Sequence, residues 1–266
     1  MRVGAGPDIY ARDPLREVDG IPVFCTDSEF TRNYDAVYAD VFKEIEAGRD
    51  PNETEMFREF ERADVALIRE HTQGGRILDC GVAMGRILGM LPDSYEKYGF
   101  DINLPCLRLA RGRGVEACLA MVEDLPYRPG SFDLALCSDF LEHVLDMNLA
   151  VRNILAALRP GGLLFVRTPW REDLAPYLRD DYPYRYHHVR NFDEHGFRLF
   201  FEKVMDCEFL EWRLVGWSIS AQRRNTAIPF AGRLTRLAGV FSEPLRQRLL
   251  RRFYLAHEIE VVVRKR

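Results

Sequence analysis

The stretch ILDCGVAMGR, residues 77–86, begins as an apolar strand and ends as a glycine-containing turn. Gly81 permits a tight turn with a positive φ, and Gly85 permits close helix packing or close approach of a ligand. Ala83 stands in the middle of the turn, where its methyl excludes backbone conformations that only glycine tolerates but need not block a ligand. Ligands of open α/β sheets bind beyond the carboxyl ends of the strands, so the turn predicts a cofactor site. A plain strand-to-helix turn is the alternative, and the turn alone does not decide between them.

Strands and helices alternate on both sides of this turn. Apolar runs predict strands at 76–81, 96–102, 115–122, 131–139, 163–169, 209–220 and 257–266. We expect one helix over 140–159, stopped by Pro160, Gly161 and Gly162. The alternation indicates βαβ units, and near-continuous apolar runs indicate helices on both faces. The predicted fold class is α/β, with a Rossmann-like, doubly wound, mostly parallel seven-stranded sheet whose two last strands form an antiparallel edge.

The other segments surround this core. Residues 1–72 are predicted to form an N-terminal extension and helical cap, because 28–71 shows two amphipathic helical faces separated by a break at 48–52. The core is expected at 73–222 and includes an aromatic, charged lid segment at 170–190. A basic helical insertion at 223–256 and a closing strand at 257–266 complete the predicted chain.

Composition limits the classes of protein to consider. The chain has 266 residues, of which 47% are hydrophobic, enough for one sizeable core. The net charge of −4 gives no general attraction to nucleic acid or membranes. Six scattered cysteines without a Cys-x-x-Cys pair indicate reduced structural thiols in a cytoplasmic protein. We find no apolar run of the ~20 residues that a transmembrane helix needs.

An acid follows the second predicted strand of the core. Asp101 ends YGFD, 16 residues after Gly85. A carboxylate in this place can accept hydrogen bonds from both ribose hydroxyls of a nucleoside. Capping the next helix is its alternative role. NAD and other nucleoside cofactors fit the turn and Asp101 equally well.

Four motifs together narrow the choice. ILDCGVAMGR, YGFDIN, EDLPYRPGSFDLALCSDFLEHV and LRPGGLLFVRTP closely resemble the class I S-adenosylmethionine-dependent methyltransferases, above all the type 11 group related to ubiquinone and menaquinone biosynthesis. The resemblance runs from about Arg76 to Thr168 and implies S-adenosylmethionine as cofactor and S-adenosylhomocysteine as product. It implies that the cofactor is bound by Asp79, Gly81, Val82, Ala83, Gly85, Asp101, Ile102, Met121, Val122, Glu123 and Ser138. An acid such as Asp79 suits a sulfonium cation and would repel a phosphate.

The sequence departs from the family pattern twice. Ala83 replaces the middle glycine, and Met121 stands where the family usually has the acid that contacts the adenine amino group. Met121 can only pack on the ring. The Val122 backbone can still pair with adenine, and Glu123 or Asp124 can substitute for the missing acid. The departures bear on cofactor affinity rather than on the fold.

Three histidines are candidates for the chemistry. Methyl transfer from a sulfonium is an in-line displacement, so the protein mainly positions the two partners. A hydroxyl acceptor also needs a base, for which histidine is the usual residue. His143 follows the fourth predicted strand of the core, and His187 and His188 lie in the lid. These three are the predicted catalytic or acceptor-binding residues; the alternative for the lid pair is a structural hydrogen bond.

A metal-binding cluster is a weaker reading of the same region. Asp139, Glu142 and His143 resemble a Glu-x-x-Glu-His cluster that binds a divalent metal in some quinone O-methyltransferases, and Asp139 and His143 would share one helical face. We favour the alternative, in which no metal binds and Glu142 and His143 steady the start of the helix.

The acceptor is expected to be a small molecule methylated on a hydroxyl. The aromatic lid suits a phenolic or glycosidic acceptor, although the lid could equally pack on the N-terminal helices. Nine arginines from Arg213 to Arg252 favour a phosphorylated or lipid-linked acceptor or an anionic surface, with a solvated face as the alternative.

Three other functions are less favoured. An RNA methyltransferase conflicts with the pI of about 5.9, so we expect no nucleic-acid partner. A non-catalytic protein that binds S-adenosylmethionine would explain Ala83 and Met121. A dehydrogenase would bind NAD instead.

Overall fold

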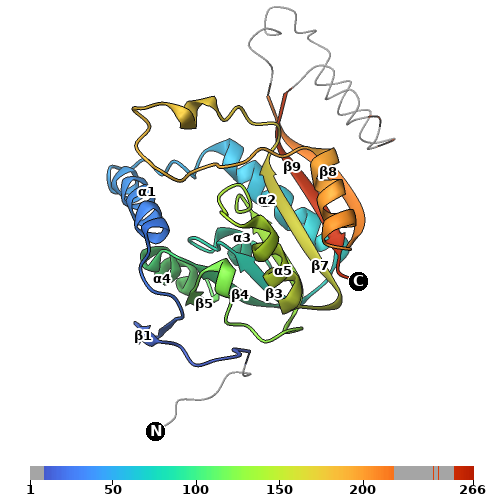
Figure 1. The fold of residues 1–266 in the computed structure, drawn as a ribbon, viewed down its shortest axis with the longest axis horizontal. Coiled ribbons are helices and arrows are strands. Elements are labelled where there is room, and N and C mark those ends of the chain that lie inside the picture. The colour runs from blue at the N-terminus through green and yellow to red at the C-terminus, as the bar shows by residue number, and fades with distance from the viewer. Residues whose placement is uncertain (1–8, 219–241, 243–244, 246–254) are drawn as a thin grey trace, which may run out of the picture.

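The computed structural model describes residues 9–218, 242, 245 and 255–266 (Figure 1). The basic insertion predicted at 223–256 lies almost entirely outside the described residues. Within the described ranges, no helix combines the length and hydropathy needed to cross a membrane. All six cysteines are free and five are buried, as the scattered spacing predicts.

The centre of the fold is a mostly parallel sheet of nine strands in the order β1-β2-β5-β4-β3-β6-β7-β9-β8. Neighbours from β2 to β7 run parallel, and β9 is antiparallel to both β7 and β8. The strands are β1 Arg16–Val18, β2 Ile21–Val23, β3 Gly75–Cys80, β4 Tyr95–Asp101, β5 Glu116–Leu119, β6 Phe132–Ser138, β7 Leu158–Pro169, β8 Glu208–Ser218 and β9 Leu255–Arg264.

The expected count of seven strands is wrong. All seven predicted strands are present, but the N-terminal hairpin β1–β2 adds two more at the β5 edge. Val23 pairs with Leu119, and the next N–H, that of Phe24, donates to the Leu119 carbonyl at 2.8 Å. Joining the sheet gives the backbone of this short apolar run hydrogen-bond partners that it could not find alone.

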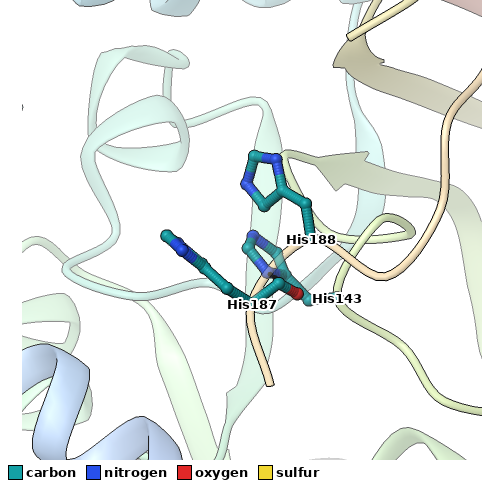
Figure 2. A group of neighbouring side chains, drawn as sticks. All are labelled: His143, His187 and His188. Carbon is teal, nitrogen blue, oxygen red and sulfur yellow. Dashed lines mark hydrogen bonds between the residues drawn. The ribbon is translucent and has the colours of Figure 1, made fainter. Parts of the chain in front are cut away.

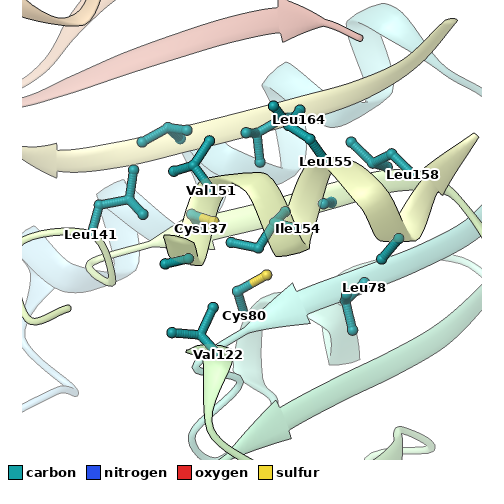
Figure 3. Packing of buried hydrophobic residues seen from close by; sticks show 14 of the residues in the cluster. Leu78, Cys80, Val122, Cys137, Leu141, Val151, Ile154, Leu155, Leu158 and Leu164 are labelled. Carbon is teal, nitrogen blue, oxygen red and sulfur yellow. The ribbon is translucent and has the colours of Figure 1, made fainter. Parts of the chain in front are cut away.

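Helices cover both faces of the sheet, as expected for a doubly wound fold. α2, α3 and α4 pack through Leu67, Leu88 and Leu107 on one face. α5 covers the other face, where Val151 and Ile154 lie over Leu78 and Leu164 (Figure 3). The helices are α1 Glu29–Glu46, α2 Glu55–His71, α3 Arg86–Met90, α4 Leu104–Gly112, α5 Met147–Ala157 and α6 Glu194–Leu199, with single turns at Val122–Asp124, Ala175–Leu178 and Phe200–Val204.

Capping residues set several helix boundaries. The Ser28 hydroxyl accepts from the Thr31 N–H and begins α1, and the Thr54 hydroxyl accepts from the Phe57 N–H and begins α2. The single helix predicted from residue 140 is wrong at its start. Asp146 caps α5 by accepting from the Leu149 N–H at 3.0 Å, so residues 140–146 form a loop. This loop brings side chains from the end of β6 to the carboxyl edge of the sheet.

Asp133 fixes three central strands in register. Its carboxylate accepts from the Arg76 N–H at 2.8 Å and from the Arg159 guanidinium, so β6 is tied to the starts of β3 and β7. Burial alone would raise the pKa of Asp133, but these donors lower it below its ordinary value.

Candidate active site

A cavity of about 670 Å³ opens at the carboxyl edge of the sheet. The turn after β3, the ends of β4 to β7, helices α1 and α2 and the lid of residues 170–190 line it. This volume falls within the roughly 300–1,000 Å³ of small-molecule sites. The cavity lies at the edge where ligands of open α/β sheets bind.

The turn after β3 adopts three left-handed conformations, with φ of +73° at Gly81, +43° at Ala83 and +72° at Gly85. The methyl of Ala83 is compatible with this left-handed conformation, although an L residue there costs roughly 1–2 kcal/mol. The Ala83 N–H donates to Asp101 Oδ2 at 2.9 Å, which holds the strained turn in place. Gly81 differs from Ala83 because it has no room for a side chain. A Cβ at Gly81 would lie 2.6 Å from the Phe140 ring.

Gly85 serves packing rather than the cavity. A Cβ at this position would lie 2.9 Å from the Cα of Ala110 in α4. Gly85 does not belong to the cavity lining, so of the two roles that the sequence left open, close packing is the one observed.

Asp101 is buried at the end of β4 and lines the cavity. Its Oδ2 accepts from Ala83, and its Oδ1 accepts from the Asn103 N–H at 2.9 Å. Burial raises the pKa of this carboxyl, which the backbone hydrogen bonds partly oppose. The alternative role of Asp101 as a helix cap is wrong, because the Asn103 side chain caps α4 by accepting from the Cys106 N–H.

The other predicted cofactor residues surround the same cavity. It is lined by Asp79, Gly81, Val82, Ala83, Ile102, Met121, Val122, Glu123 and Ser138. Burial, with the nearby charges of Asp64 and Asp101, raises the pKa of Asp79 well above its ordinary value, and an arriving cation would lower it. The hydroxyl of Ser138 donates to Asp64 at 2.7 Å instead of pointing freely into the cavity. Their roles in cofactor binding stay predictions.

A buried ion-pair network that the sequence analysis missed supports the cavity. Arg167 of β7 donates to Asp64 of α2 at 2.9 Å and to both oxygens of Asp139 at 2.9 Å. Glu258 of β9 lies 3.7 Å away. The network fastens the helical cap to the sheet. The sequence does contain a signal for this network, a lone arginine in the apolar strand LLFVRTP. A buried arginine needs carboxylate partners.

His143, His187 and His188 line the cavity and lie next to one another (Figure 2). One ligand atom from each ring lies within 4.8 Å of the others. The ring centroids of His143 and His188 are 4.7 Å apart, and those of His187 and His188 are 4.8 Å apart. The loop after β6 supplies the first ring and the lid supplies the other two, so tertiary structure assembles the group.

Each ring is oriented through its Nδ1. The Nδ1 of His143 lies 2.8 Å from the Tyr34 hydroxyl and 3.1 Å from the His187 carbonyl. The Nδ1 of His188 lies 2.6 Å from Glu172, and that of His187 bonds to the Tyr182 hydroxyl.

Burial and neighbouring imidazoles determine the charge of the cluster. Burial, followed by the charges of the other two histidines, lowers the pKa of His143 to about 3. Burial and His188 lower the pKa of His187 to about 4. Both rings are therefore neutral near pH 7 and are weak proton acceptors. His188 is the ring of the three whose Nδ1 pairs with a carboxylate, that of Glu172.

The disfavoured metal-binding cluster of Asp139, Glu142 and His143 lacks the shared helical face that was considered for it. Asp139 and His143 lie in the loop before α5, not on one helical face, and the Asp139 carboxylate is engaged by Arg167. Glu142 is 1% exposed, and burial with the charge of Asp139 raises its pKa well above the ordinary value. The side chains that gather ligand atoms are the three histidines.

The lid is pinned to α1 and contributes to the cavity at the same time. Asn33 donates to the Tyr186 carbonyl at 2.7 Å and accepts from its N–H at 3.1 Å. The Tyr184 hydroxyl donates to Asp40 at 2.7 Å. The lid thus packs on the N-terminal helices, while Trp170 and Glu172 line the cavity.

The sheet, the glycine turn after its first core strand and the acid after the next have the arrangement found in the Rossmann-like fold of S-adenosylmethionine-dependent methyltransferases. Residues 78–166 match the family described as methyltransferase domain. S-adenosylmethionine is the cofactor of this class.

Curated relatives agree with the family. The ubiquinone biosynthesis O-methyltransferase of Xanthomonas campestris pv. campestris (strain B100) is 31% identical over 151 residues, which cover 49% of this chain and 62% of the relative. That of Bordetella avium is 34% identical over 104 residues, covering 36% of this chain and 43% of the relative. The chain thus spans less than two thirds of the length of the relatives it matches.

Solved structures show the same fold. A possible histamine N-methyltransferase from Thermotoga maritima superposes with a TM-score of 0.57 at 18% identity, covering 89% of this chain and 100% of that chain. The 4+2 cyclase SpnF superposes with a TM-score of 0.58 at 20% identity, covering 96% of this chain and 99% of that chain. At these identities the likeness concerns the fold alone.

Proposed function

We propose that this protein transfers the methyl group of S-adenosylmethionine to a hydroxyl group of a small-molecule acceptor. The observation that carries the proposal is that one cavity joins the glycine turn after β3 to the three histidines. A cofactor seated on the turn would present its methyl group toward the histidines, so transfer would need no second site.

The cofactor half of the cavity offers suitable groups. Asp101 accepts from the backbone N–H groups of Ala83 and Asn103 and retains lone-pair capacity for the ribose hydroxyls. Ile102 and Met121 offer apolar surface for the adenine ring, and Asp79 lies near the turn for the positive charge. Bound S-adenosylmethionine would supply an activated methyl group and leave as S-adenosylhomocysteine.

The acceptor half offers a base and an apolar wall. His188 is oriented by the Glu172 carboxylate, an arrangement that suits a ring accepting a proton from a hydroxyl. The acceptor oxygen would form the new bond to carbon as the carbon–sulfur bond breaks, and the bonding pair would stay on sulfur. Trp170 and Tyr34 line this half and would hold a ring-bearing acceptor.

Product release tests the proposal. We expect S-adenosylhomocysteine formation with at least one member of a panel of phenols, quinols, glycosides and their phosphorylated or lipid-linked forms; phenols lead it because the curated relatives are named for ubiquinone biosynthesis. His188→Ala should lower the rate by about 10²–10⁴-fold. His195→Ala, at an exposed histidine of α6, is the matched control and should leave the rate unchanged.

Calorimetry separates the competing functions. Binding of S-adenosylmethionine without turnover on any acceptor, RNA included, would favour a non-catalytic binding protein, and SpnF shows that this fold is not confined to proteins named methyltransferases. Turnover on RNA with a steep salt dependence would favour the RNA methyltransferase instead. No binding of S-adenosylmethionine would reject the proposal.

A further inference from the structure

We propose that His143, His187 and His188 form a binding site for one divalent cation of the zinc class. The binding claim depends only on the three side chains and their surroundings. The role of the ion toward an acceptor hydroxyl, given below, rests on the proposed function.

The spacing of the rings is close to that of a ligand set. The three ligand atoms lie within 4.8 Å of one another. Ligands of a tetrahedral site with metal–nitrogen distances of 2.0–2.1 Å stand roughly 3.3 Å apart. The ligand atoms would therefore need to converge by up to about 1.5 Å when an ion binds.

The hydrogen bonds around the rings are those of metal-binding histidines. Such residues hold one ring nitrogen with a carboxylate, carbonyl or hydroxyl partner and bind the metal through the other. Here Glu172 holds the Nδ1 of His188, and the His187 carbonyl lies 3.1 Å from the Nδ1 of His143. The Nδ1 of His187 bonds to the Tyr182 hydroxyl. In all three rings the nitrogen left for a ligand is Nε2.

A buried carboxyl group lies beside the histidine cluster. Glu142 is 1% exposed, and within the described part of the chain neither of its oxygens has a hydrogen-bond partner. Its Oε1 lies 4.0 Å from the Nε2 of His143. An isolated buried carboxylate is costly unless a cation or a proton neutralises it. A cation held by the three rings would stand beside Glu142 and supply that charge.

The ligand type selects the ion. Imidazole nitrogens suit zinc and its transition-metal neighbours, whereas magnesium prefers oxygen ligands and keeps several waters. Asp139, which would supply oxygen, is engaged by Arg167. The site therefore differs in residues and in ion preference from an acid-rich cluster on the loop before α5.

The ion would act on the acceptor. Three protein ligands leave a fourth position open to the cavity that these histidines line. An acceptor hydroxyl bound there would lose its proton to water more readily, because a metal ion lowers the pKa of a coordinated hydroxyl. With the ion bound, His188 would act as a metal ligand and not as the base. The ion would then activate the acceptor oxygen.

Metal binding without cofactor or acceptor tests the site. The full chain is stripped with a chelator and titrated with zinc chloride, and in parallel with magnesium chloride, by calorimetry. We expect one zinc ion per chain, at least 100-fold tighter than magnesium. Cobalt chloride provides a spectroscopic probe: nitrogen and oxygen ligands should give a ligand-field spectrum without the thiolate charge-transfer band that cysteine ligation would produce.

Variants assign the binding to the three rings. The double variant His143→Ala/His188→Ala should abolish stoichiometric zinc binding, and Glu172→Gln should weaken it about 10–100-fold by releasing the His188 ring. His195→Ala should bind zinc as the parent does. Circular dichroism and S-adenosylmethionine titration verify that each variant is folded.

Three outcomes would overturn the proposal: no zinc binding by the parent chain, zinc binding unchanged in the double variant, or magnesium bound in preference to zinc. Because no methyl transfer is measured, these outcomes leave the proposed function untouched. Conversely, a protein that binds zinc through the histidines but never releases S-adenosylhomocysteine would keep the site and lose its role toward an acceptor.

Discussion

Replacing Arg167 by leucine should cost about 3–5 kcal/mol of unfolding free energy, the typical cost of removing one partner of a buried ion pair. The side chain of Arg167 is 3% exposed and that of Asp64 is 2% exposed, so Asp64 would be left as a buried charge without its partner. Asp139, with 33% of its side chain exposed, can turn to water and adds little to the cost.

The deficit of Arg167→Leu should grow with pH. Burial raises the pKa of Asp64, and the Arg167 charge opposes that shift. Without Arg167 the folded-state pKa of Asp64 rises further. An acid with a raised folded pKa binds more protons when folded, so its contribution to stability is complete below its unfolded pKa and is lost as the pH rises. The variant should therefore be closest to the parent at about pH 5 and furthest from it at about pH 8.

Urea denaturation followed by circular dichroism at these two pH values measures the effect. Arg198→Leu is the control, because Arg198 forms an exposed pair with Glu202 and should cost less than about 1 kcal/mol. The loss of stability in the double variant Arg167→Leu/Asp64→Asn should be about 1–3 kcal/mol smaller than the sum of the losses in the two single variants. A loss below about 1 kcal/mol in Arg167→Leu, or a deficit that shrinks as the pH rises, would refute the reasoning.

Three further predictions concern the strands, the turn and the lid. Asp133→Asn should lose about 1–3 kcal/mol near neutral pH and should approach the parent as acid protonates the native carboxylate, because its depressed folded pKa gives stability that is lost as the pH falls; thermal melts over a pH series measure this. Gly85→Ala should destabilise by at least about 1 kcal/mol in denaturation, because its positive φ and the backbone of Ala110 both oppose a Cβ, whereas Gly114→Ala, with a positive φ but open space around the new Cβ, should cost less; equal effects would contradict the packing role. Asn33→Ala removes both hydrogen bonds to Tyr186 and should speed amide exchange across the lid while sparing the sheet; unchanged exchange would mean that other contacts hold the lid.

Local patterns were sufficient for most of the fold. The seven core strands, the break between α1 and α2 and the antiparallel edge follow from apolar periodicity and turn residues, which act over a few neighbours. The two strands of the N-terminal hairpin were not predicted as part of the sheet. The run IPV at 21–23 is too short to indicate which strand it pairs with. Its position in the sheet is decided by pairing with β5, almost a hundred residues later.

Some residues of the candidate site could be predicted from the sequence, and others could not. The turn at Gly81 to Gly85 and the acid Asp101 were found because a nucleoside site at the end of a strand uses residues that lie close in sequence or at the ends of neighbouring strands. The Asp64–Arg167 pair was missed, since its members stand 103 positions apart and nothing local links an acid of one helix to an arginine of one strand.

The sequence by itself determined the parallel sheet, the two covered faces and the position of the glycine-containing turn, because periodicity and glycine placement are local properties. Only the tertiary structure decided which histidines meet and which acids are neutralised. His143 and the lid pair are more than forty residues apart and come together because α1 anchors the lid through Asn33. Burial then sets their charge, and burial is a property of the packed chain and not of any segment of it.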